Sequence, residues 1–374
     1  MARLHIENLT KIFGTWTKHQ VIAVKDLTLT VNEGETVALL GPSGCGKTTT
    51  LRCIAGLEIP TSGRIYIDDE DVTDLPPSKR DIGMVFQFAV TYDNISIYEN
   101  IALPLKAKKI NDAEIRNRVT EVAELLGLTN ILDIKPKGLD ISTKQRVALA
   151  RALAKEPSIL LLDEPLTPLD PLSRTKLRSD IKKLQKEKKL TIVYVTHDQS
   201  EAMSLADRVA VMNKGELIQC DTPENVYINP ANTFVAHFIG EPGMNFINSK
   251  LIIDQDDVFL RIGSQNLFLC RLLEFINKYG GDIERYEEVI LGIRPEHIEI
   301  SDKPADLEAI IELVEIHGNR SLVHLNVNDT EIIVKYPGVL VGKVNEKVWL
   351  KLQRERMVLF DKETGINLYY KNRR

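Results

Sequence analysis

The sequence predicts an α/β domain with an inserted helical subdomain, followed by a smaller all-β domain. Up to about residue 238, short apolar runs rich in β-branched residues alternate with helical stretches, and a longer helical stretch covers about residues 90–155. From residue 239 to 374, short strands with alternating apolar residues are broken by Gly, Asn and Asp. Two domains are expected, because 374 residues of which 43% are hydrophobic can bury two cores.

Five runs in the first domain are expected to form strands. Each run is short, apolar and flanked by helical sequence, which is typical of a mostly parallel sheet covered on both faces. The runs are TVALL (36–40), DIGMVF (81–86), SILLLD (158–163), TIVYVT (191–196) and RVAVM (208–212). Between the second and the third run, Ala, Leu, Glu and Lys recur at helical spacing, which predicts the inserted helical subdomain.

The second domain is expected to be a small β-barrel or β-sandwich, because many short strands follow one another. Its clearest alternating runs are VFLRIG (258–263), EVILGIRP (288–295), LVHLNVN (322–328), EIIVKY (331–336) and KVWLKL (347–352). Pro and Gly cluster in NPANTFVAHFIGEPGMN (229–245), which favours a boundary within this segment. We therefore expect domains at residues 1–238 and 239–374.

Charge, cysteine and hydropathy patterns exclude several classes of protein. A formal net charge of -5 leaves no basic excess to bind a phosphate backbone, so nucleic acid is not an expected partner. The four cysteines show no CxxC spacing, so we expect reduced thiols rather than disulfides or a zinc site. No window approaches the roughly 18 consecutive apolar residues of a spanning helix, so any membrane contact is expected to go through another subunit.

A glycine-rich loop follows the first predicted strand and matches the phosphate-binding pattern GxxxxGK[ST] in its required strand, loop and helix order. Glycines let successive backbone N–H groups point at phosphate oxygens, and the helix N-terminus adds a favourable dipole. Lys47 is expected to reach the β- and γ-phosphates, and the Thr48 hydroxyl is expected to ligate magnesium. The expected nucleotide-binding residues of this loop are Gly41, Pro42, Ser43, Gly44, Cys45, Gly46, Lys47, Thr48 and Thr49.

Two acidic residues end a later strand, in SILLLDEP, where the ligands of an open α/β sheet gather. Adjacent strand residues point to opposite sides, so these two carboxylates can have different roles. We expect Asp163 to hold magnesium through a water and Glu164 to act as general base on the attacking water. Alone, this pair is more often a strand end capped by acids; its position after the glycine-rich loop favours catalysis.

Two further polar residues lie at strand ends. His197 follows TIVYVT and precedes the helical DQSEAM, which places it near a γ-phosphate. The other six histidines are interpreted as structural. Gln87 follows the strand that ends in Phe86, and we expect it to reach the magnesium shell at the entry to the helical insert.

Taken together, these motifs resemble those of the ATP-binding-cassette ATPases, and the whole chain resembles the maltose and multiple-sugar importer subgroup. GPSGCGKTT resembles the P-loop, Gln87 the Q-loop, LLLDEP the Walker B strand, Pro168-Leu169-Asp170 the D-loop and VTHD the switch histidine. QRVALARAL (145–153) is similar to the helix after the family signature. LGIRPEHIEI (291–300) resembles the transport-associated OB-fold module, which implies an OB-like regulatory C-terminal domain.

The resemblance implies an ATP- and Mg²⁺-dependent ATPase at the cytoplasmic face of the cell membrane. Two such subunits would sandwich ATP head to tail and drive two transmembrane permease subunits, which would dock near Phe88–Tyr98. Phe13 aligns best with the aromatic residue that stacks on adenine, and Trp16 is the competitor. Sugar is the expected solute; polyamine, sulfate and iron importers share the C-terminal module.

One segment departs from the family. The signature LSGGQ should precede KQRVALARAL (144–153), but an ungapped alignment places Leu139-Asp140-Ile141-Ser142-Thr143 there. An alternative alignment, Ile141-Ser142-Thr143-Lys144-Gln145, needs a two-residue deletion that would rotate the following helix by roughly 200°, so we prefer the ungapped one. Asp140 is then also suited to cap the helix.

This departure bears on the expected partner. In the family the signature approaches the γ-phosphate held by the opposite subunit, where Asp140 would repel the phosphate and Ile141 would block the backbone. We therefore expect a heterodimer with a related cassette whose signature is intact, and a homodimer that tolerates the change is the alternative. A soluble cassette ATPase of DNA repair or translation is disfavoured because neither a second cassette nor a long coiled coil is present. A regulator without hydrolysis is disfavoured because Glu164 and His197 are retained.

Overall fold

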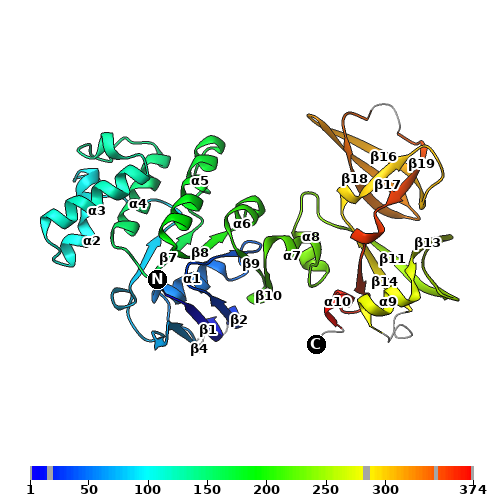
Figure 1. The fold of residues 1–374 in the computed structure, drawn as a ribbon, viewed down its shortest axis with the longest axis horizontal. Helices are drawn as coiled ribbons and strands as arrows, with labels where there is room; N and C mark the ends of the chain where they lie inside the picture. Colours follow the sequence, from blue (N-terminus) through cyan, green and yellow to red (C-terminus); the bar gives the residue numbers. More distant parts are fainter. Residues whose placement is uncertain (1, 15–19, 281–286, 341–343, 372–374) are drawn as a thin grey trace. The chain divides into compact units, whose positions relative to one another are not determined.

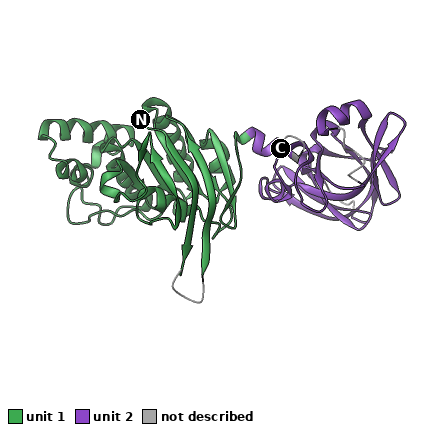
Figure 2. Cartoon of the chain, turned by 90° about the horizontal axis from the view of Figure 1, so that it is seen from below, with its two compact units in different colours: residues 1–223 green, residues 224–374 purple. Residues whose placement is uncertain are grey.

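The computed structural model describes the chain except for residues 1, 15–19, 281–286, 341–343 and 372–374. The chain forms two compact units, Met1–Pro223 and Glu224–Arg374, which Figure 2 shows in green and purple. Within the described residues, no helix is both long and apolar enough to cross a membrane.

The centre of the first unit is a six-stranded sheet with the strand order β10-β9-β3-β8-β7-β6 (Figure 1). Neighbouring strands from β9 to β6 are parallel, and β10 pairs with β9 in the antiparallel direction. Every residue of β3, β7 and β8 is buried, as expected for a parallel sheet covered on both faces. The strands are β3 (Thr36–Leu40), β6 (Ile82–Val85), β7 (Ile159–Asp163), β8 (Thr191–Thr196), β9 (Arg208–Asn213) and β10 (Glu216–Asp221).

Helices connect these strands and cover the sheet. They are α1 (Lys47–Ala55), α5 (Pro171–Lys188) and α6 (Gln199–Leu205). Asp170 caps α5 by accepting from the backbone N–H groups of Leu172 and Ser173, and Pro171 occupies the first helical position. Because α1, α5 and α6 follow β3, β7 and β8, the loops before all three helices lie at one edge of the sheet.

A second, antiparallel sheet in the first unit has the order β2-β1-β4-β5 and was not predicted from the sequence. Its strands are β1 (Leu4–Phe13), β2 (Val21–Val31), β4 (Ser62–Ile67) and β5 (Glu70–Asp71). Apolar residues of these strands share one buried core with α1 and the central sheet; they include Leu4, Ile6, Leu9, Val24 and Ile65. This core fixes the position of α1 and of the loop before it.

The helical subdomain is inserted between β6 and β7, as expected. It consists of α2 (Ile97–Ala107), α3 (Asp112–Leu125), the short 3₁₀ helix η2 (Thr129–Ile131) and α4 (Ile141–Ala154). Ser96 and Glu99 form a capping box at the start of α2, and Asn111 caps α3. A further 3₁₀ helix, η1 (Pro77–Lys79), precedes β6.

The second unit contains two five-stranded antiparallel sheets, β13-β12-β11-β14-β20 and β15-β19-β16-β17-β18, which share a buried apolar core. Its strands are β11 (Asn245–Asp254), β12 (Asp257–Ile262), β13 (Gln265–Arg271), β14 (Glu288–Ile293), β15 (Ile298–Ser301), β16 (Leu307–His317), β17 (Arg320–Val327), β18 (Thr330–Pro337), β19 (Lys347–Leu352) and β20 (Val358–Asp361). Its helices are α7 (Pro223–Ile228), α8 (Thr233–Phe238), α9 (Leu272–Tyr279), η4 (Pro295–His297), η5 (Arg354–Arg356) and α10 (Leu368–Lys371).

The second unit begins at Glu224, whereas the sequence-based boundary lies after residue 238. Contacts of α8 explain this difference. Asn232 forms a β-bridge with Ile366, and the backbone N–H of Met244 donates to the carbonyl of Ala236. Ala236 also packs with Phe360 in a small apolar cluster, so α8 belongs structurally to the β-rich unit.

Candidate active site

The glycine-rich loop joins β3 to α1 and needs glycine for steric reasons. Gly46 has a φ of 104°, and a Cβ at this position would lie 2.3 Å from the carbonyl oxygen of Ala23. A Cβ on Gly41 would lie 2.3 Å from the carbonyl oxygen of Met212. Larger residues would therefore push the loop away from the strands beneath it and spoil the cradle at the N-terminus of α1.

Lys47 is buried inside this loop. Its Nζ donates hydrogen bonds to the carbonyl oxygens of Gly41 at 2.7 Å and Pro42 at 3.0 Å. Two carbonyl oxygens of the loop thus hold the ammonium group, and phosphate oxygens can take their place as acceptors. Burial raises the pKa of the neighbouring Cys45 thiol, so this cysteine is protonated at neutral pH.

Thr48 and Asp163 meet although they are far apart in the sequence. The Thr48 hydroxyl donates to Oδ1 of Asp163 at 3.1 Å. Burial is the main cause that raises the pKa of Asp163, and the charge of Glu164 raises it further. A buried carboxylate next to a hydroxyl is an oxygen donor set that suits Mg²⁺. Within the described residues no group of three His, Cys, Asp or Glu side chains could hold a metal ion. Gln87, the third expected magnesium ligand, donates to Glu164 in this structure.

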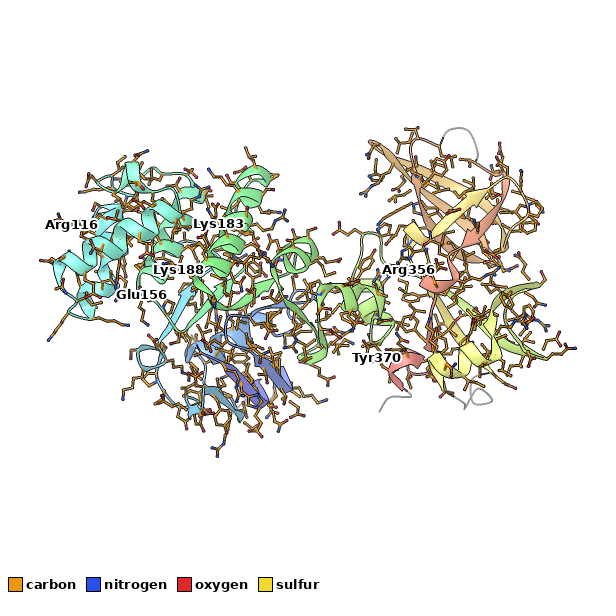
Figure 3. All side chains as sticks on the ribbon, in the orientation of Figure 1. Arg116, Glu156, Lys183, Lys188, Arg356 and Tyr370 are labelled. Carbon is orange, nitrogen blue, oxygen red and sulfur yellow. The ribbon has the colours of Figure 1, made fainter. Side chains whose placement is uncertain are left out.

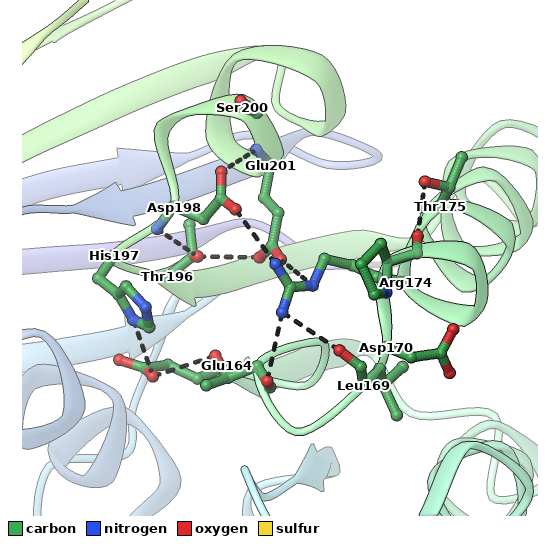
Figure 4. Close-up of polar contacts among 12 residues, drawn as sticks. Glu164, Leu169, Asp170, Arg174, Thr175, Thr196, His197, Asp198, Ser200 and Glu201 are labelled. Carbon is green, nitrogen blue, oxygen red and sulfur yellow. Dashed lines mark hydrogen bonds and ion pairs between the residues drawn. The ribbon is translucent and has the colours of Figure 1, made fainter. Parts of the chain in front are cut away.

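The carboxylate of Glu164 is the centre of a polar cluster at the end of β7. Glu164 has a φ of 46°, an uncommon left-handed conformation, and its backbone N–H donates to the carbonyl of Val195 at 3.0 Å. Its Oε2 accepts from Gln87 Nε2 at 3.3 Å and from the Thr167 hydroxyl at 3.3 Å. The same oxygen lies 3.1 Å from His197 Nδ1, a contact that Figure 4 shows. The structure therefore brings Gln87, Glu164 and His197 together.

Thr167 is a member of this cluster that the sequence analysis missed. It lies between the LLLDEP run and the Pro168-Leu169-Asp170 segment, and its hydroxyl contacts Glu164. A single hydroxyl in a loop gives no motif signal. Its position three residues after an expected catalytic carboxylate is the only sequence feature that points to it.

The segment that the ungapped alignment matches to the signature spans the start of α4. Asp140 is the N-cap and accepts from the backbone N–H of Thr143 at 2.9 Å and from its hydroxyl at 2.6 Å. These bonds lower the pKa of Asp140, so its charge persists at neutral pH. Ile141 is 56% exposed. Gln145 is buried and donates to the carbonyl of Phe86, which is one residue before Gln87.

Two expected contact regions lie on the surface of the first unit. Phe13 ends β1 and is 39% exposed, with the Nζ of Lys11 4.9 Å from its ring centroid. Its competitor Trp16 lies outside the described residues. In the expected docking segment, Phe88, Val90 and Tyr92 are all exposed, at 71%, 57% and 51%. Exposed aromatic residues so close together are typical of a binding surface.

Comparison with known proteins agrees with this geometry. The model of the ABC transporter family matches residues 24–167, and the model of the TOBE domain matches residues 291–360. The chain is 35% identical, with a TM-score of 0.54, to a dimeric ATP-binding cassette in a post-hydrolysis state bound to ADP and Pi. That match covers 59% of this chain and 98% of the solved chain.

Curated relatives match over nearly the whole chain. The trehalose/maltose import ATP-binding protein of Thermococcus litoralis is 43% identical, over 98% of this chain and 99% of that protein. The maltose/maltodextrin import ATP-binding protein of Vibrio cholerae is 39% identical, over 98% and 100%. The sn-glycerol-3-phosphate import ATP-binding protein of Psychromonas ingrahamii is 40% identical, over 98% and 95%. The resemblance drawn from the motifs is confirmed: the chain belongs to the ABC transporter family, as an ATP-hydrolysing subunit with a C-terminal TOBE domain.

Proposed function

We propose that this chain hydrolyses Mg²⁺-bound ATP at the edge of its central sheet and thereby drives a sugar importer. One observation carries the proposal: Gln87, Thr167 and His197 all contact the carboxylate of Glu164 within 3.3 Å. Glu164 follows Asp163, which is itself bonded to Thr48 of the phosphate-binding loop. A candidate base, a candidate metal site and a phosphate cradle therefore lie at one sheet edge.

In this proposal the nucleotide is held by the loop Gly41–Thr49, with Lys47 exchanging its bonds to loop carbonyls for bonds to the β- and γ-phosphates. Phe13 stacks on the adenine ring. Thr48, Asp163 and Gln87 would hold a magnesium ion, with Asp163 expected to act through a water. When bound, the metal ion neutralises charge that develops on the phosphate oxygens.

Glu164 orients the attacking water and accepts its proton, because its carboxylate is fixed by three polar side chains and remains partly open to solvent. His197, which directly follows β8, contacts the γ-phosphate in this proposal. Its bond to Glu164 links the position of the histidine to the position of the base.

The names of two relatives support sugars as the transported class, because they concern maltose. Polyamine, sulfate and iron remain the alternative solutes. Two transmembrane permease subunits dock at Phe88–Tyr98, where exposed aromatic residues gather. The chain then acts as a peripheral subunit at the cytoplasmic face of the membrane. Its C-terminal β-rich unit, from Glu224, is regulatory.

For the second cassette we propose a related chain with an intact signature, so that the complex is a heterodimer. The charge of Asp140 and the exposed side chain of Ile141 stand where the family brings small residues to the partner's phosphate. A homodimer is the alternative, favoured by the role of Asp140 as a helix cap. In the heterodimer and in the homodimer alike, this chain contributes Lys47, Glu164 and His197 to an ATP site.

The test is Glu164→Gln in the transporter complex assembled with its membrane subunits. We expect unchanged ATP binding and a turnover at least about a hundredfold lower, since the amide cannot accept the proton of the attacking water. Phosphate release reports turnover, and calorimetry reports binding. Near-normal phosphate release would remove Glu164 from the role of base.

A further inference from the structure

Arg174 lies in the first turn of α5, and its guanidinium group sits between two loops of the active site (Figure 4). One loop, residues 164–170, follows β7 and carries Glu164 and Thr167. The other, residues 197–198, lies between β8 and α6 and carries His197. We propose that Arg174 is a positioning residue that ties these loops together and so aligns the side chains that hold Glu164. The inference rests on the proposed role of Glu164 in hydrolysis.

On the side of the first loop, Arg174 binds the backbone. Its Nη2 donates to the carbonyl oxygen of Leu169 at 3.2 Å and to that of Thr167 at 3.4 Å. The hydroxyl of Thr167 is the group that donates to Glu164. Arg174 therefore holds the backbone of a residue that directly contacts the expected base.

On the side of the second loop, Arg174 faces two carboxylates. Its Nη1 lies 3.8 Å from Asp198 Oδ2, and its Nε lies 4.0 Å from Glu201 Oε1. Asp198 directly follows His197 and caps α6 by accepting from the backbone N–H of Glu201. A cation at this place attracts the segment that carries His197 toward the loop that carries Glu164.

Glu201, in the first turn of α6, gives the second loop a fixed anchor. Its side chain is only 2% exposed, and its Oε2 accepts from the hydroxyls of Tyr194 at 2.8 Å and Thr196 at 2.9 Å, both on β8. In the ion pairs of the described residues, Arg174 is the cation that approaches Glu201. The contact thus connects α5 to a carboxylate that is bonded to the central sheet, rather than to a mobile surface group.

The shape of the guanidinium group explains why arginine suits this position. Its planar fork can donate to carbonyl oxygens on one side while facing carboxylates on the other, whereas a lysine ammonium is a single point of charge. The buried Nε has no hydrogen-bond partner and is the atom that faces Glu201. A small approach of α6 to α5 would complete this bond and draw the two loops together.

The experiment compares Arg174→Met and Arg174→Lys in the full-length chain within its transporter complex. Loss of loop alignment misplaces Thr167 and His197, and a misplacement of about 1 Å can cost about a hundredfold in rate. We expect Arg174→Met to lower kcat about tenfold to a hundredfold, while KM for ATP stays within about twofold because the phosphate loop is untouched. Arg174→Lys keeps the charge but not the fork, so its kcat should lie between those of Arg174→Met and the unchanged chain.

The matched control is Lys183→Met, which removes an exposed cation from the same helix (Figure 3). It should leave kcat, KM and the unfolding temperature unchanged. Glu201→Gln serves as the second leg of a double-mutant cycle. If Arg174 acts through Glu201, the double variant loses less activity than the product of the two single losses.

The inference would be overturned by an unchanged kcat in Arg174→Met. It would also be overturned if Arg174→Met lowered ATP affinity and the unfolding temperature together with kcat, as general destabilisation would. Full additivity with Glu201→Gln would be the third contradicting result. Glu164→Gln is measured in parallel. If it is inactive while Arg174→Met is fully active, only the positioning role fails. If Glu164→Gln is itself active, the proposed function fails.

Discussion

The edge of the central sheet and the first turn of α4 differ in a way that matters for function. At the sheet edge, Thr48 contacts Asp163 and His197 contacts Glu164, so the expected catalytic groups are connected to one another. At the start of α4, Asp140 instead binds its own helix through Thr143. In the proposed head-to-tail pair these regions would serve opposite ATP molecules. If the proposed pairing holds, the half of a shared site at the sheet edge keeps its chemistry while the half at α4 changes.

The largest effect is expected from Lys47→Ala, a substitution in the phosphate-binding loop at the edge of the central sheet. The substitution removes the buried ammonium group that is held at the mouth of the phosphate cradle, so tight ATP binding should be lost. Isothermal titration calorimetry measures the affinity. Lys183→Ala, at an exposed position on α5, is the control and should bind ATP normally. Equal affinities of the two variants would contradict the cradle assignment.

Asp163→Asn should have two opposite effects. Because burial raises the pKa of Asp163, its ionised form is costly without a metal ion, so the nucleotide-free variant should unfold at a slightly higher temperature. The same substitution removes a magnesium ligand, so turnover should fall and need more Mg²⁺. Thermal unfolding without nucleotide and a Mg²⁺ titration of the ATPase rate check both effects. Unchanged Mg²⁺ dependence would exclude Asp163 from the metal site.

A smaller effect is expected from Phe13→Ala, which tests the expected adenine contact rather than the phosphate-binding loop. Stacking of a base on an aromatic ring contributes about 1 to 3 kcal/mol, so ATP should bind about 5- to 150-fold more weakly. Trp16→Ala is the matched comparison and should bind ATP as the unchanged chain does. Weaker binding in Trp16→Ala alone would assign the adenine contact to Trp16.

The parallel sheet was predictable because its strands are continuous apolar runs. The expected runs at 36–40 and 191–196 coincide with β3 and β8. The antiparallel sheet was not predictable, because β1 is irregular. Leu4, Ile6 and Leu9 are buried, and the pairing of β1 with β2 shifts between Ile6 and Leu9. This shift interrupts the period-2 alternation of buried and exposed side chains along β1. Period-2 patterns fail where a strand contains such an irregularity.

The residues of the candidate site also divide into those that the sequence predicts and those that only the fold reveals. Lys47, Glu164 and His197 could be predicted as candidates because each lies in a short, recognisable pattern that follows a strand, and their roles stay predictions. Thr167 and Arg174 were not found, since their importance depends on contacts between loops that only the fold brings together. No local pattern distinguishes Arg174 from the other cations of α5.

The contrast between the sheet edge and the start of α4 is tested most directly by the ATPase rate of the purified chain alone, with and without Asp140→Ser. Serine also caps helices well, so the substitution removes the charge and leaves α4 intact; Asp140→Asn serves as a second capping control. We predict slow hydrolysis by the chain alone, a clear increase in both variants, and fast hydrolysis when a co-encoded cassette is added. Robust hydrolysis by a pure homodimer, unchanged by Asp140→Ser, would contradict the account.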